Sequence, residues 1–291
     1  MKLVRYRNGW GEGLAAYIDG EWRGLAVTHA ALHGGAEEVL LSPGRLSSVL
    51  ETFALEGQRL DMDEITYLAP ISSSRKIICV GLNYHDHSAE SGFKQPDYPT
   101  LFFRVGTSLT AHGRGIVRPS FSDSLDFEGE LAAVIGKGGS NIPAADAFEH
   151  VAGYSIFNDV TVREYQFKTP QWTVGKNFDG TGAFGPWFVT TDEFPDGGRG
   201  RTLETRLNGA VMQRASLDDM VFGLPRLIET ISRAITLEPG DVIVTGTPSG
   251  VGHARNPRVY MKPGDVVEVE IEGLGVLSNT IIDEPSSKRA A

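Results

Sequence analysis

The stretch Leu125-Asp126-Phe127-Glu128-Gly129-Glu130-Leu131-Ala132 leads an acidic run directly into an apolar one. On a strand, alternate residues share a face, so Asp126, Glu128 and Glu130 are expected to point one way. Three carboxylates on one face repel each other unless solvent or a cation relieves them. All-oxygen ligation favours Mg²⁺, Mn²⁺ or Ca²⁺ over zinc. The stretch therefore indicates either a divalent metal site or an acidic edge exposed to solvent.

A third ligand is offered by Asp159, at the end of an apolar strand predicted from Tyr154 to Val160. A carboxylate in that position is expected at the rim of a sheet, facing a cleft. The alternative is a helix cap, in which Asp159 starts a helix over Thr161 to Phe167.

His87 and Glu90 are three residues apart, so they share a face if the segment around them is helical. A carboxylate beside a histidine raises the basicity of the imidazole and holds it as a general base. A solvated helix face is the alternative. A His85-x-His87 metal site would need a strand, because the two side chains diverge on a helix.

Lys176 lies in the glycine-rich segment from Thr173 to Gly180. It could reach a carboxylate or a developing oxyanion, or it could be a surface lysine whose stem covers apolar atoms. A second glycine-rich segment, Thr245 to Gly252, could cradle an anion with its backbone N–H groups or form a plain tight turn. It lacks the Gly-Lys-Ser/Thr ending of a nucleotide-binding loop, so we reject nucleotide binding.

Composition places this chain of 291 residues among globular proteins, with 41% hydrophobic residues and a net charge of −10. The negative charge argues against nucleic-acid and membrane-surface partners. The single cysteine, Cys79, lies among apolar residues and is predicted to be a buried strand residue, not a nucleophile. Because the N-terminus shows no signal peptide and no apolar run is long enough to span a membrane, we expect a cytoplasmic protein.

The chain is expected to fold as two parts and a tail. Residues 1–70 are predicted to form a small α+β domain, with a hairpin at Asp19-Gly20 and a helix from Leu46 to Glu56. Residues 71–284 form the catalytic, metal-binding domain, and residues 285–291 a frayed tail. The remaining predicted elements are strands over Lys76–Val80 and Leu131–Ile135, a helix from Pro225, and a mobile surface loop over Asp192–Arg201.

The order of these motifs resembles the fumarylacetoacetate hydrolase family over roughly residues 76–282. The matching segments are Asn83-Tyr84-His85-Asp86-His87, Glu128-Gly129-Glu130, Asn158-Asp159, Lys176-Asn177-Phe178-Asp179 and Thr245 to Gly252. The resemblance implies a β-rich α+β fold, a mixed β-sandwich roll preceded by a small N-terminal domain, and a homodimer. It also implies a divalent cation, Mg²⁺ with Mn²⁺ or Ca²⁺ as alternatives.

The resemblance further implies roles for individual residues. Glu128, Glu130 and Asp159 become metal ligands, His87 and Glu90 a water-activating pair, and Lys176 a catalytic residue. Arg163, Gln166, Asp179 and Thr247 become substrate contacts. Arg104 stands where many members have a lysine; an arginine could still bind a carboxylate, but it is a poorer proton donor.

The leading hypothesis is hydrolytic C–C cleavage of an acylpyruvate-type 1,3-dioxo acid, as in aromatic catabolism. The metal would stabilise the departing enolate, His87 would activate water, and Lys176 and Gln166 would stabilise the oxyanion. The alternative is a lyase or isomerase acting on 2-oxo acids: an oxaloacetate decarboxylase, or a 2-oxo-alkenoate hydratase or isomerase. A non-catalytic scaffold would need neither His87 nor Lys176, and a metal-dependent oxygenase would use His85 and His87. Gly92, Pro96 and Pro99 make the segment over Ser88–Pro99 compatible with a mobile lid.

Overall fold

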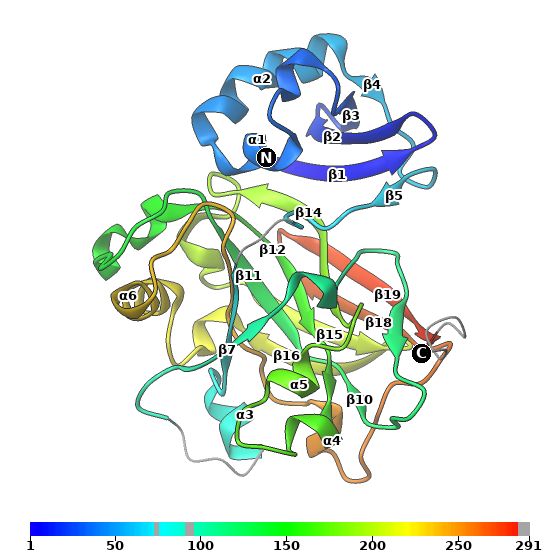
Figure 1. Ribbon diagram of the computed structural model, residues 1–291, viewed down its shortest axis with the longest axis vertical. Coiled ribbons are helices and arrows are strands. Elements are labelled where there is room, and N and C mark those ends of the chain that lie inside the picture. Colours follow the sequence, from blue (N-terminus) through cyan, green and yellow to red (C-terminus); the bar gives the residue numbers. More distant parts are fainter. Residues whose placement is uncertain (73–75, 91–95, 285–291) are drawn as a thin grey trace.

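The apolar run that follows Glu130 forms β11 (Gly129–Ile135), in which every residue is buried. It pairs antiparallel with β12 (Val151–Asp159), which is also buried along its whole length. Strands buried on both faces have continuous apolar sequences. Both strands lie within a long mixed sheet in the computed structural model, which describes residues 1–72, 76–90 and 96–284 (Figure 1).

The long sheet has twelve strands in the described part of the chain. From one edge to the other its main path is β4 (Gln58–Arg59), β3 (Glu21–Ala26), β2 (Gly11–Ile18), β1 (Lys2–Asn8), β14 (Gly182–Thr190), β12, β11, β17 (Val242–Val244), β6 (Ile77–Gly81) and β7 (Thr100–Arg104). Off this path, β5 (Thr66–Tyr67) pairs with β1 and β8 (Leu109–Ala111) with β14. Two pairs, β17 with β6 and β14 with β8, are parallel, so the sheet is mixed.

A second sheet packs against one face of the first. Its order is β16 (Ala210–Ser216), β15 (Thr202–Leu207), β18 (Val266–Ile271), β19 (Gly275–Asp283) and β9 (Ile116–Arg118), and a separate short pair joins β10 (Leu125–Asp126) to β13 (Thr161–Val162). Leu131 and Ile156 of the long sheet share one core with Val269 and Leu277 of the second sheet. This packing of mixed sheets confirms the predicted β-rich α+β class and the β-sandwich.

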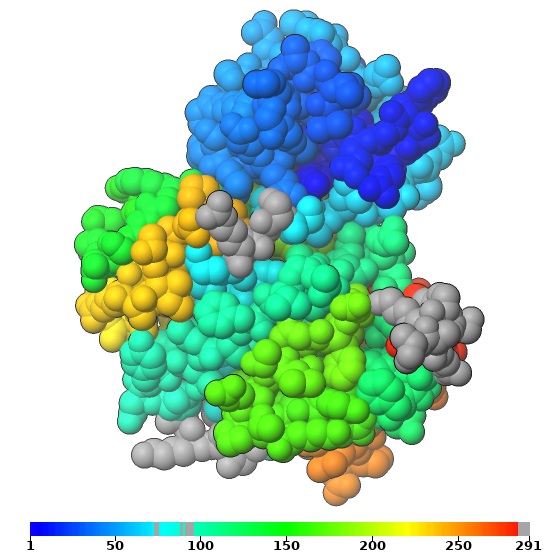
Figure 2. Space-filling model, in the orientation of Figure 1, coloured from blue at the N-terminus to red at the C-terminus, as the bar shows by residue number. Residues whose placement is uncertain are grey.

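The first seventy residues form the blue lobe of Figures 1 and 2. Its helices, α1 (Ala36–Leu41) and α2 (Pro43–Glu56), contribute to a second core that also contains Ala132 and Val134 of β11. The predicted helix from Leu46 is confirmed, and the structure starts it at Pro43. The other face of the long sheet is therefore buried as well.

The predicted hairpin joins β2 to β3 through Asp19 and Gly20, whose φ angles of 50° and 86° are those of a two-residue turn with left-handed backbone. The lobe also extends the main sheet, because Lys2 of β1 pairs with Val189 of β14. The division of the chain at residue 70 stays a prediction.

The remaining helices are short, apart from α6. They are α3 (His85–Glu90), α4 (Arg163–Gln166), α5 (Thr173–Lys176) and α6 (Leu224–Ala234), with 3₁₀ turns η1 (Ala30–Leu32), η2 (Gly106–Ser108), η3 (Ala144–His150), η4 (Pro195–Gly198), η5 (Leu217–Asp219) and η6 (Gly252–Ala254). The helix predicted from Pro225 is confirmed by α6. Within the described ranges, no helix has the length and apolar character needed to cross a bilayer.

One loop differs from its prediction. The expectation of a surface loop over Asp192–Arg201 is wrong at Phe194, which is fully buried and packs on Tyr154 with ring centroids 5.0 Å apart. Burial of the Phe194 ring anchors this polar, glycine-rich segment to the core. The predicted tail and residues 91–95 of the candidate lid lie outside the described residues.

Candidate functional site

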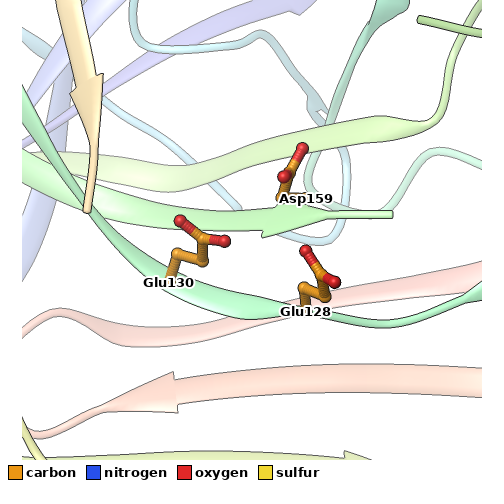
Figure 3. Close-up of side chains that lie close together, drawn as sticks. All are labelled: Glu128, Glu130 and Asp159. Carbon is orange, nitrogen blue, oxygen red and sulfur yellow. The ribbon is translucent and has the colours of Figure 1, made fainter. Parts of the chain in front are cut away.

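Glu128, Glu130 and Asp159 form a cluster of buried carboxylates at the ends of two adjacent strands. Gly129 pairs with Asn158, and the Asp159 amide donates to the Glu128 carbonyl at 2.8 Å, which brings the three side chains to one place. One oxygen from each lies within 4.8 Å of the others, and their residues are 4%, 2% and 0% exposed. Figure 3 shows the three side chains close together on neighbouring strands, with their carboxylates projecting to the same side. The separation suits ligands of a single cation.

The expected alternation fails at Asp126. The chain leaves β10 after Asp126 and enters β11 only at Gly129, so the two strands do not form one continuous ladder. The Asp126 carboxylate instead accepts hydrogen bonds from the amides of Gly252 and His253, at 2.8 and 2.9 Å, and pairs with Arg163 at 2.8 Å. Asp126 is therefore outside the carboxylate cluster.

Asp159 is not the helix cap that the sequence also allowed. The following helix, α4, begins at Arg163, and its N-cap residue is Val162, without a side-chain cap. The carboxylate of Asp159 is directed instead into the cluster, where it accepts a hydrogen bond from Lys176 at 2.7 Å.

Two buried cations face the cluster. Lys176 Nζ contacts Glu128 Oε2 as well as Asp159 Oδ2, and Arg163 Nη2 lies 2.7 Å from Glu128 Oε1. Burial alone would raise the pKa of Glu128, but Lys176 and Arg163 lower that pKa to about 2. Burial alone would lower the pKa of Lys176, but Asp159 and Glu128 raise it, so the lysine is a cation.

Glu130 is held differently from the other two carboxylates. It accepts a hydrogen bond from the Gly246 amide. Burial, together with the negative charges of Asp159 and Glu128, raises the pKa of Glu130 well above its usual range. A divalent cation would relieve that repulsion, and three carboxylates are the donors that Mg²⁺, Mn²⁺ and Ca²⁺ prefer. The residues therefore fit such an ion.

His87 and Glu90 form the second part of the site, on the short helix α3. His87 Nδ1 lies 3.1 Å from Glu90 Oε1, and His87 is 6% exposed. The neighbouring His85 is exposed, as expected when the segment is helical, so His85 and His87 do not converge on a metal. The pair has the geometry of an imidazole oriented by a carboxylate.

The glycine-rich loop after β17 does cradle anions, and these are carboxylates of the protein itself. The Gly246 amide donates to Glu130, and the Gly250 amide donates to Glu90 at 3.0 and 2.9 Å. Further along the same loop, the amides of Gly252 and His253 donate hydrogen bonds to the Asp126 carboxylate. Gly246 and Gly250 have φ angles of 101° and 102°, which explains glycine at these two positions.

These groups meet in a cavity of about 650 Å³. Nine of the predicted site residues line it: His87, Glu90, Glu128, Glu130, Asp159, Arg163, Gln166, Lys176 and Thr247. Sequence reasoning missed His253 and Arg258 on its wall, because they lie in a stretch without periodicity or a motif. Apolar side chains, among them Phe102 and Trp172, complete the lining.

Two other predicted substrate contacts lie elsewhere. Asp179 lines a separate depression beside Gly180 and Arg114. The Arg104 side chain is fully buried and is not among the residues that line the cavity. Its guanidinium binds Asp159 from behind the cluster.

Comparisons with known proteins agree on one family. The profile described as fumarylacetoacetate (FAA) hydrolase C-terminal matches residues 76–282. The oxaloacetate tautomerase YisK of Bacillus subtilis is 43% identical over 225 residues, which is 76% of this chain and 74% of that protein. The human mitochondrial oxaloacetate tautomerase FAHD2A is 41% identical over 239 residues, 81% of this chain and 76% of that protein. A solved structure of a fumarylacetoacetate hydrolase from Exiguobacterium antarcticum has a TM-score of 0.83 and 35% identity, covering 98% of this chain and 100% of that chain.

Proposed function

This chain belongs to the fumarylacetoacetate hydrolase family, and from that premise we propose that it interconverts the keto and enol forms of a small 2-oxo acid, with oxaloacetate as the first candidate. Family membership supports an enzyme that acts on oxo acids. The observation that carries the finer proposal is that a carboxylate cluster and a His–Glu pair face one cavity. The similarity to two oxaloacetate tautomerases favours tautomerisation over the other reactions of 2-oxo acids.

Glu128, Glu130 and Asp159 are the residues that would hold a divalent cation, with Mg²⁺ as the first candidate and Mn²⁺ or Ca²⁺ as alternatives. A bound cation supplies Lewis-acid stabilisation of the negative charge that an enolate carries. Lys176 and Arg163 add positive charge beside the same carboxylates. The substrate's own carboxylate is thereby attracted to a site that would otherwise repel it.

His87 is the proposed proton carrier. Because Nδ1 faces Glu90, Nε2 is the nitrogen that exchanges protons with the substrate. Tautomerisation needs one proton removed from the carbon next to the 2-oxo group and one delivered to the oxygen, so no water is consumed. Lys176 and Gln166 would donate hydrogen bonds to the oxygen as its charge develops.

A second candidate is hydrolytic cleavage of an acylpyruvate. In that reaction His87 would take a proton from water, the hydroxide would attack the distal carbonyl, and the C–C bond would break to release pyruvate and a carboxylic acid. The size and lining of the cavity support this second candidate. Its volume of about 650 Å³ is larger than a four-carbon acid needs, and Phe102, Trp172 and Val251 give part of its wall an apolar character.

We further propose a cytoplasmic homodimer with a small-molecule substrate and no nucleic-acid or membrane partner, in keeping with the net charge of −10.

The test is a product analysis with metal-stripped protein, with and without Mg²⁺ or Mn²⁺. Enol oxaloacetate is followed by its ultraviolet absorbance, while pyruvate and CO₂ are measured in the same samples. Metal-restored loss of the enol without pyruvate supports the tautomerase. Release of pyruvate and CO₂ from oxaloacetate would identify a decarboxylase, and release of pyruvate and an acid from an acylpyruvate would identify the hydrolase. No turnover of either substrate would contradict both candidates.

A further inference from the structure

Arg104 is a buried cation at the back of the carboxylate cluster. It ends β7, and its side chain has no solvent exposure. Nη1 contacts Asp159 Oδ1 and also donates to the Val160 carbonyl at 3.2 Å. Nη2 donates to Thr181 Oγ1 at 2.7 Å, and Nε lies 3.3 Å from Ser108 Oγ. The guanidinium is therefore held on all sides by the protein.

The neighbouring strand leaves room for this arrangement. Gly182 pairs with Asp159 across β12 and β14. A Cβ at Gly182 would lie 2.9 to 3.0 Å from Nε, Cζ and Nη2 of Arg104, and the first of these contacts is closer than real Cβ atoms approach. Glycine at this position thus allows the guanidinium to reach Asp159.

The two oxygens of Asp159 consequently have different partners. Oδ1 contacts Arg104, whereas Oδ2 contacts Lys176, which also binds Glu128. Rotation of the carboxylate would break the contact with Arg104. Its orientation is therefore set by a residue that does not line the cavity.

We propose that Arg104 is a positioning residue that fixes Asp159 as a one-oxygen ligand: Arg104 occupies Oδ1, and Oδ2, which Lys176 contacts within the cluster, is the oxygen that binds the cation. This inference rests on the metal site proposed above. A residue that hydrogen-bonds to a metal-binding carboxylate without itself binding the metal orients that carboxylate and tunes the affinity of the site for the metal. The planar guanidinium of Arg104 binds Asp159, Val160 and Thr181 through two separate nitrogens. A lysine carries its donors on a single nitrogen and does not reproduce that geometry.

Arg104→Lys tests the proposal while retaining the positive charge. The dissociation constant for Mn²⁺ is measured by calorimetry on the metal-stripped protein without substrate. We expect Arg104→Lys to weaken Mn²⁺ binding by about 10- to 100-fold. Arg206→Lys is the matched control, because Arg206 is likewise an arginine paired with carboxylates, but it lies on β15 and outside the cavity lining. It should bind Mn²⁺ as the wild type does.

Thr181→Val provides a second variant if Arg104→Lys does not fold, because it keeps the guanidinium and removes only the acceptor at Nη2. We expect Thr181→Val to weaken Mn²⁺ binding as well, by a smaller factor than Arg104→Lys. Folded variants with wild-type Mn²⁺ affinity would overturn the proposal. An unchanged Mn²⁺ affinity with a raised KM would instead make Arg104 a substrate contact. Wild-type protein that binds no Mn²⁺ would refute the metal site itself, and this inference with it.

Discussion

The Gly250 amide donates hydrogen bonds to both carboxylate oxygens of Glu90, at 3.0 and 2.9 Å, across 160 residues of sequence. The same carboxylate faces His87 Nδ1 at 3.1 Å. Helix α3 is thereby tied to the loop that also holds Glu130 through Gly246. The His87–Glu90 pair and Glu130 of the carboxylate cluster are thus positioned by one short stretch of backbone.

Glu90→Gln should lower kcat without changing metal affinity. Glutamine still offers an oxygen to the Gly250 amide, but it removes the negative charge that stabilises a protonated His87. We expect kcat to fall by about 10- to 100-fold, less than the loss expected when a general base itself is removed. Steady-state kinetics and Mn²⁺ calorimetry measure the two quantities. Glu164→Gln, an exposed residue of α4, serves as the control, and an unchanged kcat in Glu90→Gln would refute the role of the pair.

Asp126→Asn should destabilise the fold. Asp126 is fully buried and pairs with Arg163 at 2.8 Å while accepting hydrogen bonds from three backbone amides. Asparagine leaves Arg163 with one counter-charge fewer, and breaking a buried ion pair costs about 3 to 5 kcal/mol of unfolding free energy. Urea denaturation measures this loss.

Asp123→Asn is the matched control for that substitution. Asp123 pairs with Arg118 at 2.7 Å, but its side chain is 97% exposed. Exposed ion pairs contribute little because solvent screens them. Equal midpoints for the two variants would contradict the structural role of Asp126.

The sequence allowed the carboxylate cluster to be predicted, because strand alternation and strand ends are local properties. Glu128 and Glu130 share a face, and Asp159 ends a strand, as expected from the pattern. Asp126 fits the same alternating sequence pattern, yet its side chain lies outside the cluster because its backbone belongs to a different strand pair. Where one strand ends and the next begins depends on pairing strands that are far away in the sequence, so a local sequence pattern does not reveal it.

Distant contacts explain the other differences. The glycine-rich loop was expected to bind an anion or to form a plain turn, but the carboxylates that it holds lie more than a hundred residues away along the chain. Motif position alone predicts substrate contacts at Arg104 and Asp179. A motif gives the position of a residue along the chain but not the partners that surround its side chain. The partners of Arg104 come from η2, β12 and the residue that precedes β14.

Cys79 should be unreactive in the native protein. It lies fully buried in β6, and burial, together with Asp159 and Glu130, raises the pKa of its thiol well above the usual value. The thiolate is the reactive form, so a disulfide reagent at pH 8 should modify Cys79 only after unfolding. Rapid modification of the folded protein, measured by released chromophore, would contradict the buried position.

The most direct test of the account is the rate of oxaloacetate tautomerisation as Mn²⁺ is added to the metal-stripped wild type and to Glu130→Gln. Glu130 is the suitable proposed ligand to change, because glutamine can still accept the Gly246 hydrogen bond, and the ion pairs of Lys176 are with Glu128 and Asp159. We predict saturable restoration by Mn²⁺ in the wild type and none in Glu130→Gln. Full activity without metal, or equal restoration in both proteins, would contradict the assignment of the three carboxylates as the catalytic metal site.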